Sequence, residues 1–508
     1  MTHSSTIARS VGTVMAAVLA ALADDALAIP AGMPASMEDM WKIIQQQQRE
    51  IEALKKKISG APAPAEAAKE TAPAGGGAAV ASQEASGATS QPAGQPPATS
   101  SKKSGKTEQE RKTDILATEV EKLKTQLNIP DKREYKSLYG MGPAASQVYM
   151  VKRGLSIGGY GEYFYTNFQN ERDTRRRDEV DFVRLVLYAG YKFNDWIVLN
   201  SEIEFEHGTT GSGAEDRGEV SVEFSQLDFL LDERVNIRTG LMLMPMGFIN
   251  EIHEPLFFHG NRRPDVERYI IPTTWREVGA GLHGEALPGL TYRVYGVNSL
   301  NAGTTADTGF TSAGIRDSRQ SGSRAVAEDW AFVGRFDYAP EALTGMFFGG
   351  SAFVGDAGQG ATFVGRKADV LTQLYEGHVQ WHYRGLEFRA LGAWGHIGDA
   401  SLVSAQKGET IGSQNYGYYA ELAYDVMPFL WPTSTQFLAP FFRFERFDTI
   451  AAAPRGFSDN GFWNRTIYQG GLTYKPHPNI VIKADYRNIG AQSGGVPDEF
   501  NLGVGFIY

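Results

Sequence analysis

Cysteine is absent from this chain of 508 residues. Its absence excludes disulfide bonds, zinc sites with thiolate ligands and thiol nucleophiles. It also fits an oxidising compartment, where an unpaired thiol is a hazard. The composition therefore favours a protein that works outside the cytoplasm.

The chain also lacks, beyond its N-terminus, an apolar run long enough for a membrane-spanning helix. Such a helix needs about 18 or more consecutive apolar residues, and the mean hydropathy of the chain is -0.30. A β-barrel escapes this test, because only every second residue of a barrel strand faces lipid. Net positive charge is lacking too, since the formal net charge is -10. This balance argues against nucleic acid as a partner.

The last nine residues alternate between apolar and small or polar side chains. The apolar positions fall at period two and are Phe500, Leu502, Val504, Phe506 and Tyr508. One face of this predicted strand is apolar, and no later segment of the sequence can cover it, so lipid is the expected cover. A terminal strand that ends on an aromatic residue resembles the closing strand of bacterial outer-membrane β-barrels. The last strand of a soluble sandwich is the alternative.

The N-terminal segments read as targeting and assembly elements. Residues 1–28 are predicted to be a secretory signal peptide, with Arg9 ahead of an apolar stretch and a small-x-small cleavage site at its end. A retained membrane anchor is the weaker alternative, because the apolar stretch is short. Residues 29–59 carry a heptad pattern with Ile44 and Ile51 at one position. This pattern predicts a coiled coil that suits a trimer, with a plain amphipathic helix as the alternative.

The next segments differ sharply in composition. Residues 60–106 are rich in Ala, Pro and Gly and predict a flexible linker. Residues 107–130 form a second predicted helical segment, which Pro130 ends. Residues 131–508 are predicted to hold the β-barrel.

Period-two alternation recurs in about sixteen segments of this last region. The segments begin near Leu155, Val180, Asp195, Glu219, Val235, Glu277, Leu290, Val326, Met346, Val370, Leu386, Tyr416, Gln436, Trp463, Ile480 and Pro497. Short links, such as residues 192–195 and 287–289, alternate with long ones. The short links suit the periplasmic side and the long links the outside. We therefore predict an all-β fold, a transmembrane antiparallel β-barrel of about 16 strands, preceded by a periplasmic helical coiled coil and a disordered linker.

The alternation also predicts which side chains point into the barrel. In the second segment, Leu185, Leu187 and Tyr191 are expected to face lipid, and Phe182, Arg184 and Tyr188 to face inward. Across the barrel the predicted pore-lining cations are Arg184, Arg238, Arg293, Arg335, Arg389, Arg443, Lys483 and Arg487. Carboxylates share the interior, with Glu202, Glu204 and Glu206 on one strand. A polar interior in a barrel of this size indicates a water-filled pore; the alternative is that these charges pair and hold the wall.

The connection from Met244 to Arg276 is too apolar and aromatic for a free external loop. We expect it to fold into the lumen and narrow the pore. Its candidate constriction residues are Asn250, Glu251, His253, Glu254, Arg262, Arg263, Arg268 and Trp275. Glu251, His253, Glu254 and His259 lack the helical spacing of a metal site. No metal and no cofactor are therefore expected.

The motifs of this loop resemble the phosphate-selective porin family. They are Pro245-Met-Gly-Phe-Ile-Asn250-Glu251, His253-Glu-Pro255, Arg263-Pro and Ile270-Ile-Pro-Thr-Thr-Trp275-Arg-Glu277-x-Gly279. The resemblance covers about residues 155–508 and implies a trimeric outer-membrane barrel of sixteen strands. Family members known for phosphate use an Arg ladder and a Lys cluster, and the Lys cluster has no counterpart here.

The leading hypothesis is an outer-membrane porin of a Gram-negative bacterium, which lets small hydrophilic solutes diffuse passively and favours anions such as phosphate. Its expected partners are outer-membrane lipid, two further copies of itself in a homotrimer, small anionic or neutral solutes and, through the N-terminal segment, peptidoglycan. One alternative is a structural tether between membrane and cell wall. The other is an outer-membrane enzyme, for which no Gly-x-Ser-x-Gly elbow is present.

Overall fold

The computed structural model describes residues 135–169, 176–209, 218–306 and 308–508. The predicted signal peptide, coiled coil, linker and second helical segment lie outside these residues. The chain divides into residues 1–102 and 103–508, and all described residues belong to the second unit.

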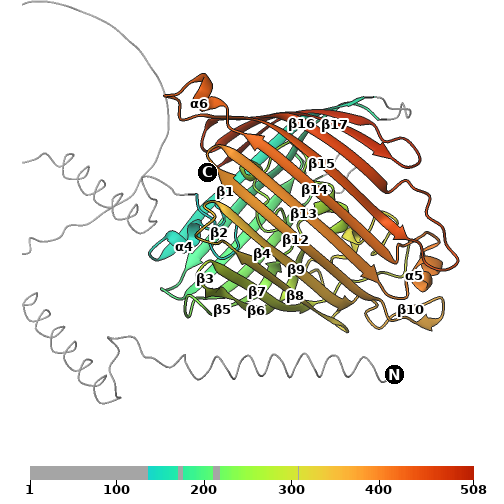
Figure 1. Ribbon diagram of the computed structural model, residues 1–508. Coiled ribbons are helices and arrows are strands. Elements are labelled where there is room, and N and C mark those ends of the chain that lie inside the picture. Colours follow the sequence, from blue (N-terminus) through green and yellow to red (C-terminus); the bar gives the residue numbers. More distant parts are fainter. Residues whose placement is uncertain (1–134, 170–175, 210–217, 307) are drawn as a thin grey trace, which may run out of the picture. The chain divides into compact units, whose positions relative to one another are not determined.

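Sixteen antiparallel strands close into one barrel, as predicted (Figure 1). They are β1 (Gly154–Gln169), β2 (Glu179–Lys192), β3 (Ile197–Glu206), β4 (Val220–Phe229), β5 (Asn236–Leu243), β6 (Arg276–Leu287), β7 (Leu290–Asn298), β8 (Trp330–Tyr338), β9 (Met346–Asp356), β12 (Leu371–Tyr383), β13 (Leu386–Ile397), β14 (Gln414–Tyr424), β15 (Phe437–Ala452), β16 (Asn464–His477), β17 (Ile480–Ala491) and β18 (Asp498–Ile507). Each strand pairs with its neighbours in sequence, and β18 closes the barrel by pairing with both β17 and β1.

The two ends of the barrel differ in the length of their links. The turn end carries short links such as residues 288–289, 384–385 and 478–479, and the four-residue helix α6 (Met427–Leu430). The loop end carries the long links, with the β10 (Thr362–Phe363) and β11 (Arg366–Lys367) hairpin and helix α5 (Ala400–Lys407). Short turns face the periplasm and long loops face outward in outer-membrane barrels.

Fifteen of the predicted strand starts lie within two residues of the observed ones, whereas β8 begins at Trp330 and not near Val326. The side chain of Gln320 explains this delay. It accepts a hydrogen bond of 2.7 Å from the backbone N–H of Val326 and donates one of 2.8 Å to the carbonyl of the same residue. Val326 therefore satisfies its backbone in the preceding link and not in the sheet.

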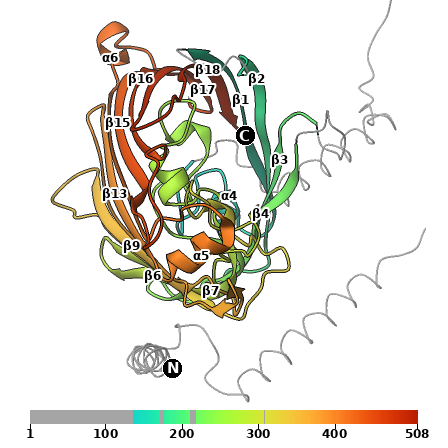
Figure 2. The ribbon, with the colours of Figure 1, turned by 90° about the vertical axis from the view of Figure 1, so that its right-hand side faces the viewer.

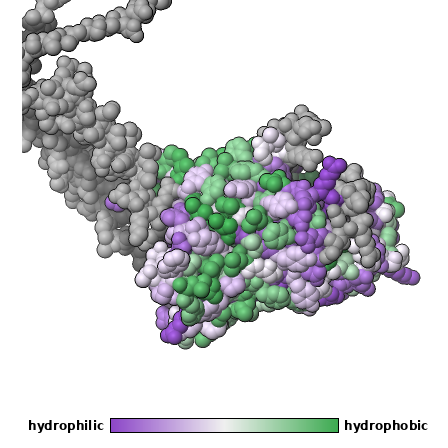
Figure 3. Space-filling view, turned by 90° about the horizontal axis from the view of Figure 1, so that it is seen from above, coloured by the Kyte–Doolittle hydropathy of each residue, from purple (hydrophilic) through white to green (hydrophobic). Residues whose placement is uncertain are grey.

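The outer wall of the barrel is apolar. Leu185, Tyr418 and Leu422 are exposed there, while the residues that alternate with them point inward and are buried. Figure 3 shows apolar residues over much of the barrel wall in this view and hydrophilic residues gathered toward the loop end. Among the residues described, no helix is both long and apolar enough to cross a membrane. A closed sixteen-stranded barrel with an apolar wall is the architecture of an outer-membrane β-barrel protein.

The predicted inward direction of Phe182 is wrong. Its side chain is 39% exposed and stacks on the exposed ring of Tyr163, with ring centroids 6.4 Å apart. The cause is a bulge in β2, because Glu162 pairs with Arg184 while Phe164 pairs with Asp181. The extra residue in β2 reverses which side chains face inward on the N-terminal side of Arg184, where Phe182 lies.

The interior of the barrel is largely filled by the protein itself. Figure 2 looks into the ring of strands and shows links and short helices lying inside it. A buried apolar cluster joins residues of the 244–275 link, such as Met246, Ile249 and Trp275, to residues of the wall, such as Tyr295 and Phe353. The lumen is therefore a set of smaller spaces around a packed centre.

Candidate functional site

The link between β5 and β6, residues 244–275, lies inside the barrel and is called the inner loop here. Asn250 closes its base: the side-chain amide donates to the carbonyls of Met244 (2.7 Å) and Trp275 (2.9 Å) and accepts from the N–H of Trp275 (2.7 Å). Two short helical turns, η1 (Pro255–Phe257) and η2 (Val266–Ile270), shape the middle of the loop. The predicted constriction residues Asn250 and Trp275 thus fix the loop and are buried.

The inner loop crosses the lumen to the strands opposite its base. The N–H of Asn261 donates to Asp485 on β17 (2.8 Å), and that of Asp265 donates to Glu445 on β15 (2.6 Å). Glu267 accepts from the hydroxyl of Tyr419 on β14 (2.6 Å). Because these partners lie on three strands far from β5 and β6, the loop divides the lumen into two parts.

A segment that precedes the first predicted strand also enters the lumen. Residues 135–151, called the lumen segment here, include helix α4 (Gln147–Met150) and bury Met141, Ala144 and Val148. The side-chain amide of Asn200 donates to the carbonyl of Ala145 (2.9 Å). Its run of small residues, Gly142-Pro-Ala-Ala-Ser146, permits close packing but has no periodicity that would have marked the segment.

All eight predicted pore-lining cations lie on the inner face of the barrel. Six pair with carboxylates: Arg184 with Glu162 and Glu204, Arg238 with Asp228, Arg293 with Glu251 and Asp337, Arg335 with Asp337, Arg443 with Glu421, and Arg487 with Asp265 and Glu499. The other two donate to carbonyls of the inner loop, Arg389 to Phe257 (3.1 Å) and Lys483 to Gly260 (2.9 Å). The alternative of paired charges that hold the wall therefore describes most of this set, and a role in conduction stays a prediction.

Two of the three carboxylates of β3 also have side-chain partners. Glu204 lies 2.9 Å from Arg184, and Glu202 contacts the ring of His253 at 3.2 Å. Burial and the guanidinium group of Arg263 lower the pKa of His253 to about 3, so its ring is neutral. The contact with Glu202 is thus a hydrogen bond between a neutral ring and a carboxyl group. The Nε and Nη2 atoms of Arg263 are themselves buried without a hydrogen-bond partner.

The four acidic and histidine side chains of the inner loop point to different partners. Glu251 pairs with Arg293 at 2.8 Å, Glu254 accepts from backbone N–H groups, and His259 lies 2.9 Å from both Thr473 and Glu387. Within the described ranges, no three His, Asp or Glu residues converge as a metal site. Each of these side chains instead attaches the loop to a different part of the barrel.

At the loop end, a cavity of about 680 Å³ lies between the inner loop and strands β1, β2, β16, β17 and β18. We call it the loop-end vestibule. Its charged lining residues are Arg176, Arg177, Arg262, Arg268, Arg465 and Arg487, and Asp178, Glu179, Asp265 and Glu499. Six guanidinium groups therefore face four carboxylates. The predicted constriction residues Arg262 and Arg268 belong to this lining.

More arginines lie near the vestibule, on the link between β7 and β8. Arg316 starts the short helix η3 (Arg316–Ser318) and donates to the hydroxyl of Thr273 (2.7 Å), while Arg319 donates to the carbonyl of the same residue (2.5 Å). Burial and the neighbouring guanidinium groups of Arg319, Arg268 and Arg263 lower the pKa of Arg316 to about 9. Like charges are crowded here, and an anion among them would relieve the repulsion.

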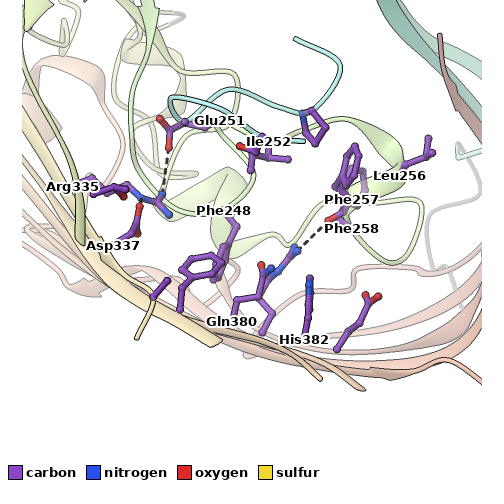
Figure 4. A pocket seen from close by; sticks show the side chains of 18 of the residues that line it. Phe248, Glu251, Ile252, Leu256, Phe257, Phe258, Arg335, Asp337, Gln380 and His382 are labelled. Carbon is purple, nitrogen blue, oxygen red and sulfur yellow. Dashed lines mark hydrogen bonds and ion pairs between the residues drawn. The ribbon is translucent and has the colours of Figure 1, made fainter. Parts of the chain in front are cut away.

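On the other side of the inner loop, a second cavity of about 580 Å³ lies near the turn end. We call it the turn-end cavity. Figure 4 shows the inner-loop residues Ile252 and Phe257 on one side of it and Gln380 and His382 of β12 on the other, with Phe248 beside Gln380. The lumen segment contributes residues such as Tyr139 and Pro143. The site thus has two compartments, one arginine-rich and one partly aromatic, with the inner loop between them.

Comparisons with known proteins give similarities but no function. No family model matches the chain, and the resemblance to phosphate-selective porins stays a prediction. Among solved structures, the chain is similar to the OmpF complex with daunomycin of Salmonella typhi, with 11% identity, a TM-score of 0.48 and coverage of 70% of this chain and 98% of that one. It is also similar to a loop-deletion mutant of OmpT, an outer membrane protein of Vibrio cholerae, with 12% identity, a TM-score of 0.44 and coverage of 70% and 100%.

A much stronger similarity is found in sequence. A protein of Aquifex aeolicus (strain VF5), described only as "Uncharacterized protein", is 36% identical over 376 residues, which cover 72% of this chain and 82% of that protein. The chain therefore belongs to the same family as this Aquifex aeolicus protein.

Proposed function

We propose that this protein is an outer-membrane porin, a passive diffusion channel for small hydrophilic solutes that favours anions such as phosphate. The observation that carries the proposal is the loop-end vestibule, where six guanidinium groups face four carboxylates. Fixed positive charge at the mouth of a water-filled path raises the local concentration of anions and lowers their entry barrier. Arginine suits this role because it stays charged and offers a planar fork for oxyanions.

The pairing of the deeper charges supports a selectivity set at the vestibule. Arg184, Arg238 and Arg443 each lie within 3 Å of a carboxylate, so their fields largely cancel. The inner loop and the lumen segment occupy much of the interior, which favours passage of small solutes only. We propose that the inner loop, with Glu251, Arg262, Arg263 and Arg268, forms the constriction.

We also propose that the protein assembles as a homotrimer, with the coiled coil of residues 29–59 in the periplasm adding register. Isoleucine at the heptad positions permits three strands, but about three heptads stabilise only weakly. Cross-linking before and after deletion of residues 29–130 tests this assignment. Trimers should persist after the deletion, and a monomeric barrel would show that the N-terminal segment is the assembly element.

Planar-bilayer recordings on the purified full-length protein test the channel itself. A tenfold KCl gradient should give single-channel currents and a reversal potential displaced toward that of chloride. A structural tether or an enzyme would give no channels. A reversal potential displaced toward that of potassium would leave a porin but contradict the anion preference.

A further inference from the structure

The turn-end cavity has a charge arrangement that differs from that of the vestibule. Each of its carboxylates already has a partner: Glu251 pairs with Arg293 (2.8 Å), Asp337 pairs with Arg335 (2.8 Å), and Glu387 lies 2.9 Å from His259. Glu285 accepts from the N–H of Gly289 (2.7 Å). The carboxylates of this cavity therefore do not need a bound cation as a partner.

Among the cations that line the cavity, Arg293 and Arg335 have carboxylate partners, whereas Arg389 has none among the described residues. Its guanidinium group donates to the carbonyl of Phe257 (3.1 Å) and lies 4.9 Å from the ring centroid of Phe248. In the described part of the chain, no ion pair within the 4.0 Å criterion involves it. The side chain is half-buried, so its remaining N–H groups are open to the cavity. Lys475 lines the same cavity and adds positive charge, with Glu387 and Asp425 as its acidic neighbours.

An apolar and partly aromatic part of the lining lies beside Arg389. Ile252 and Phe257 of the inner loop and Phe347 of β9 are half-buried and belong to it, and Figure 4 shows the first two projecting from the loop toward the space. The position of Arg389 beside Phe248 and Phe257 places a fixed cation at the edge of this apolar surface. A flat apolar group could pack on the rings while a charged group reaches the guanidinium.

We propose that the turn-end cavity binds small organic carboxylates with a flat apolar body, of which benzoate is the simplest example. The carboxylate pairs with Arg389, and the ring packs against Ile252, Phe257 and Phe347. Inorganic phosphate fits this cavity poorly, because its oxygens would meet hydrocarbon on one side and lose their hydration there. A volume of about 580 Å³ is in the range of cavities that hold small organic ligands. This inference rests on the proposed channel and names a preferred solute class for it.

Titration calorimetry on the full-length protein in detergent, with benzoate, acetate, benzamide and phosphate as probes, tests the proposal. Benzoate should bind at least tenfold more tightly than the other three, because acetate lacks the ring, benzamide the charge and phosphate both the ring and a carboxylate. The same order should appear as blockade of chloride current in planar bilayers. Binding with this order but without any current would overturn the channel and leave the site. Currents with equal effects of benzoate and phosphate would overturn the site and leave the channel.

Variants locate the binding. Arg389→Gln should weaken benzoate binding about tenfold or more, as expected when a charge-assisted hydrogen bond is lost. Phe257→Ala keeps the backbone carbonyl that Arg389 uses, and should weaken benzoate but leave acetate unchanged. Phe462→Ala, an aromatic truncation at the loop end, is the matched control and should change neither. Unchanged benzoate binding in folded Arg389→Gln and Phe257→Ala proteins would show that the ligand binds elsewhere and would overturn the proposal.

Discussion

The carboxylate of Glu254 accepts a hydrogen bond of 2.9 Å from the backbone N–H of Ala144, a residue 110 positions earlier in the chain. The same oxygen lies 3.3 Å from the N–H of Ala145, and the other carboxylate oxygen is buried without a partner. This contact joins the inner loop to the lumen segment. It does so through a buried carboxyl group that has two backbone donors and, among the described residues, no paired cation.

The first prediction is that docking of the lumen segment depends on pH through Glu254. Burial, with a further contribution from nearby Glu202, raises the pKa of Glu254 to about 8. Tyr188 faces the same carboxylate. When the segment undocks, the carboxyl group returns toward its ordinary pKa of about 4.5 and releases its proton. The docked state therefore binds more protons between these values, and its stability is full at low pH and falls as the pH rises through about 8.

Hydrogen exchange of residues 135–151 at pH 5 and pH 9 measures this effect, after correction for the intrinsic exchange rate. The corrected protection should fall at pH 9 in the wild type. Glu254→Gln keeps an oxygen that accepts from Ala144 and Ala145 but cannot ionise, so its protection should not depend on pH. Equal pH dependence in both proteins would exclude Glu254 as the titrating group.

The second prediction is that the lumen segment limits conductance. A Cβ atom on Gly142 would lie 2.5 Å from a carboxylate oxygen of Glu254, so Gly142→Val displaces this side chain from its hydrogen bonds to the N–H groups of Ala144 and Ala145. We expect undocking of residues 135–151 and a higher single-channel conductance. Gly208→Val is the control, because a Cβ atom there meets nothing within 4 Å. Wild-type conductance in a Gly142→Val protein whose segment exchanges freely would show that the segment does not narrow the path.

The third prediction concerns the buried ion pair between Arg443 and Glu421 on β15 and β14. The guanidinium group lies 2.5 Å from the carboxylate and also donates to the carbonyl of His259 in the inner loop (2.7 Å). Arg443→Met leaves a buried carboxylate alone and should reduce the free energy of unfolding by about 3–5 kcal/mol. The double variant Arg443→Met with Glu421→Leu should recover much of this loss.

Urea unfolding of the barrel in lipid vesicles measures both values. Arg446→Met is the control on the same strand, because Arg446 donates only to the uncharged side chains of Thr466 and Asn464 among the contacts described. Its effect should stay below about 1 kcal/mol. A double variant as unstable as Arg443→Met would mean that the other contacts of Arg443, with Glu445, Gln469 and the inner loop, carry the effect and not the stranded charge of Glu421.

The barrel was predictable because the alternation of apolar and polar residues can be seen within each strand by itself. Lipid on one side and protein on the other force alternation over nearly every strand, and turn residues mark the ends, as at Leu287-Pro288-Gly289. The errors in strand start and side-chain direction come from contacts with other segments, which the sequence of a single strand does not show. Phe182 follows a bulge that only the pairing of β1 with β2 defines, and the start of β8 depends on the side chain of Gln320.

The sequence predicted that charged side chains line the interior of the barrel. It did not predict which of these charges form ion pairs with one another. Alternation places Arg184 and Arg443 inside, yet their partners Glu204 and Glu421 lie on neighbouring strands whose register the sequence leaves open. The lumen segment was missed because its contacts with the barrel join residues far apart in the chain, as Ala145 and Asn200 do. A stretch of small residues carries no periodicity that would predict such a partner.

The last prediction is that the anion preference depends on the vestibule and not on the deep arginines. Arg184 and Arg238 each have a carboxylate within 3 Å, so replacing either would leave a buried negative charge without a partner. A change in ion selectivity could then not be separated from misfolding of the barrel. Arg268 is exposed in the vestibule, and Arg316 lies among like charges beside it. The double variant Arg268→Gln with Arg316→Gln should therefore displace the reversal potential in a KCl gradient toward that of potassium. Arg366→Gln, the same change on the β10–β11 hairpin outside the vestibule lining, should not.

The wild-type preference should also weaken between 0.1 M and 1 M salt, as the Debye length falls from about 10 Å to about 3 Å. An anion preference that survives the double variant unchanged at low salt would move the selective charges to another part of the channel.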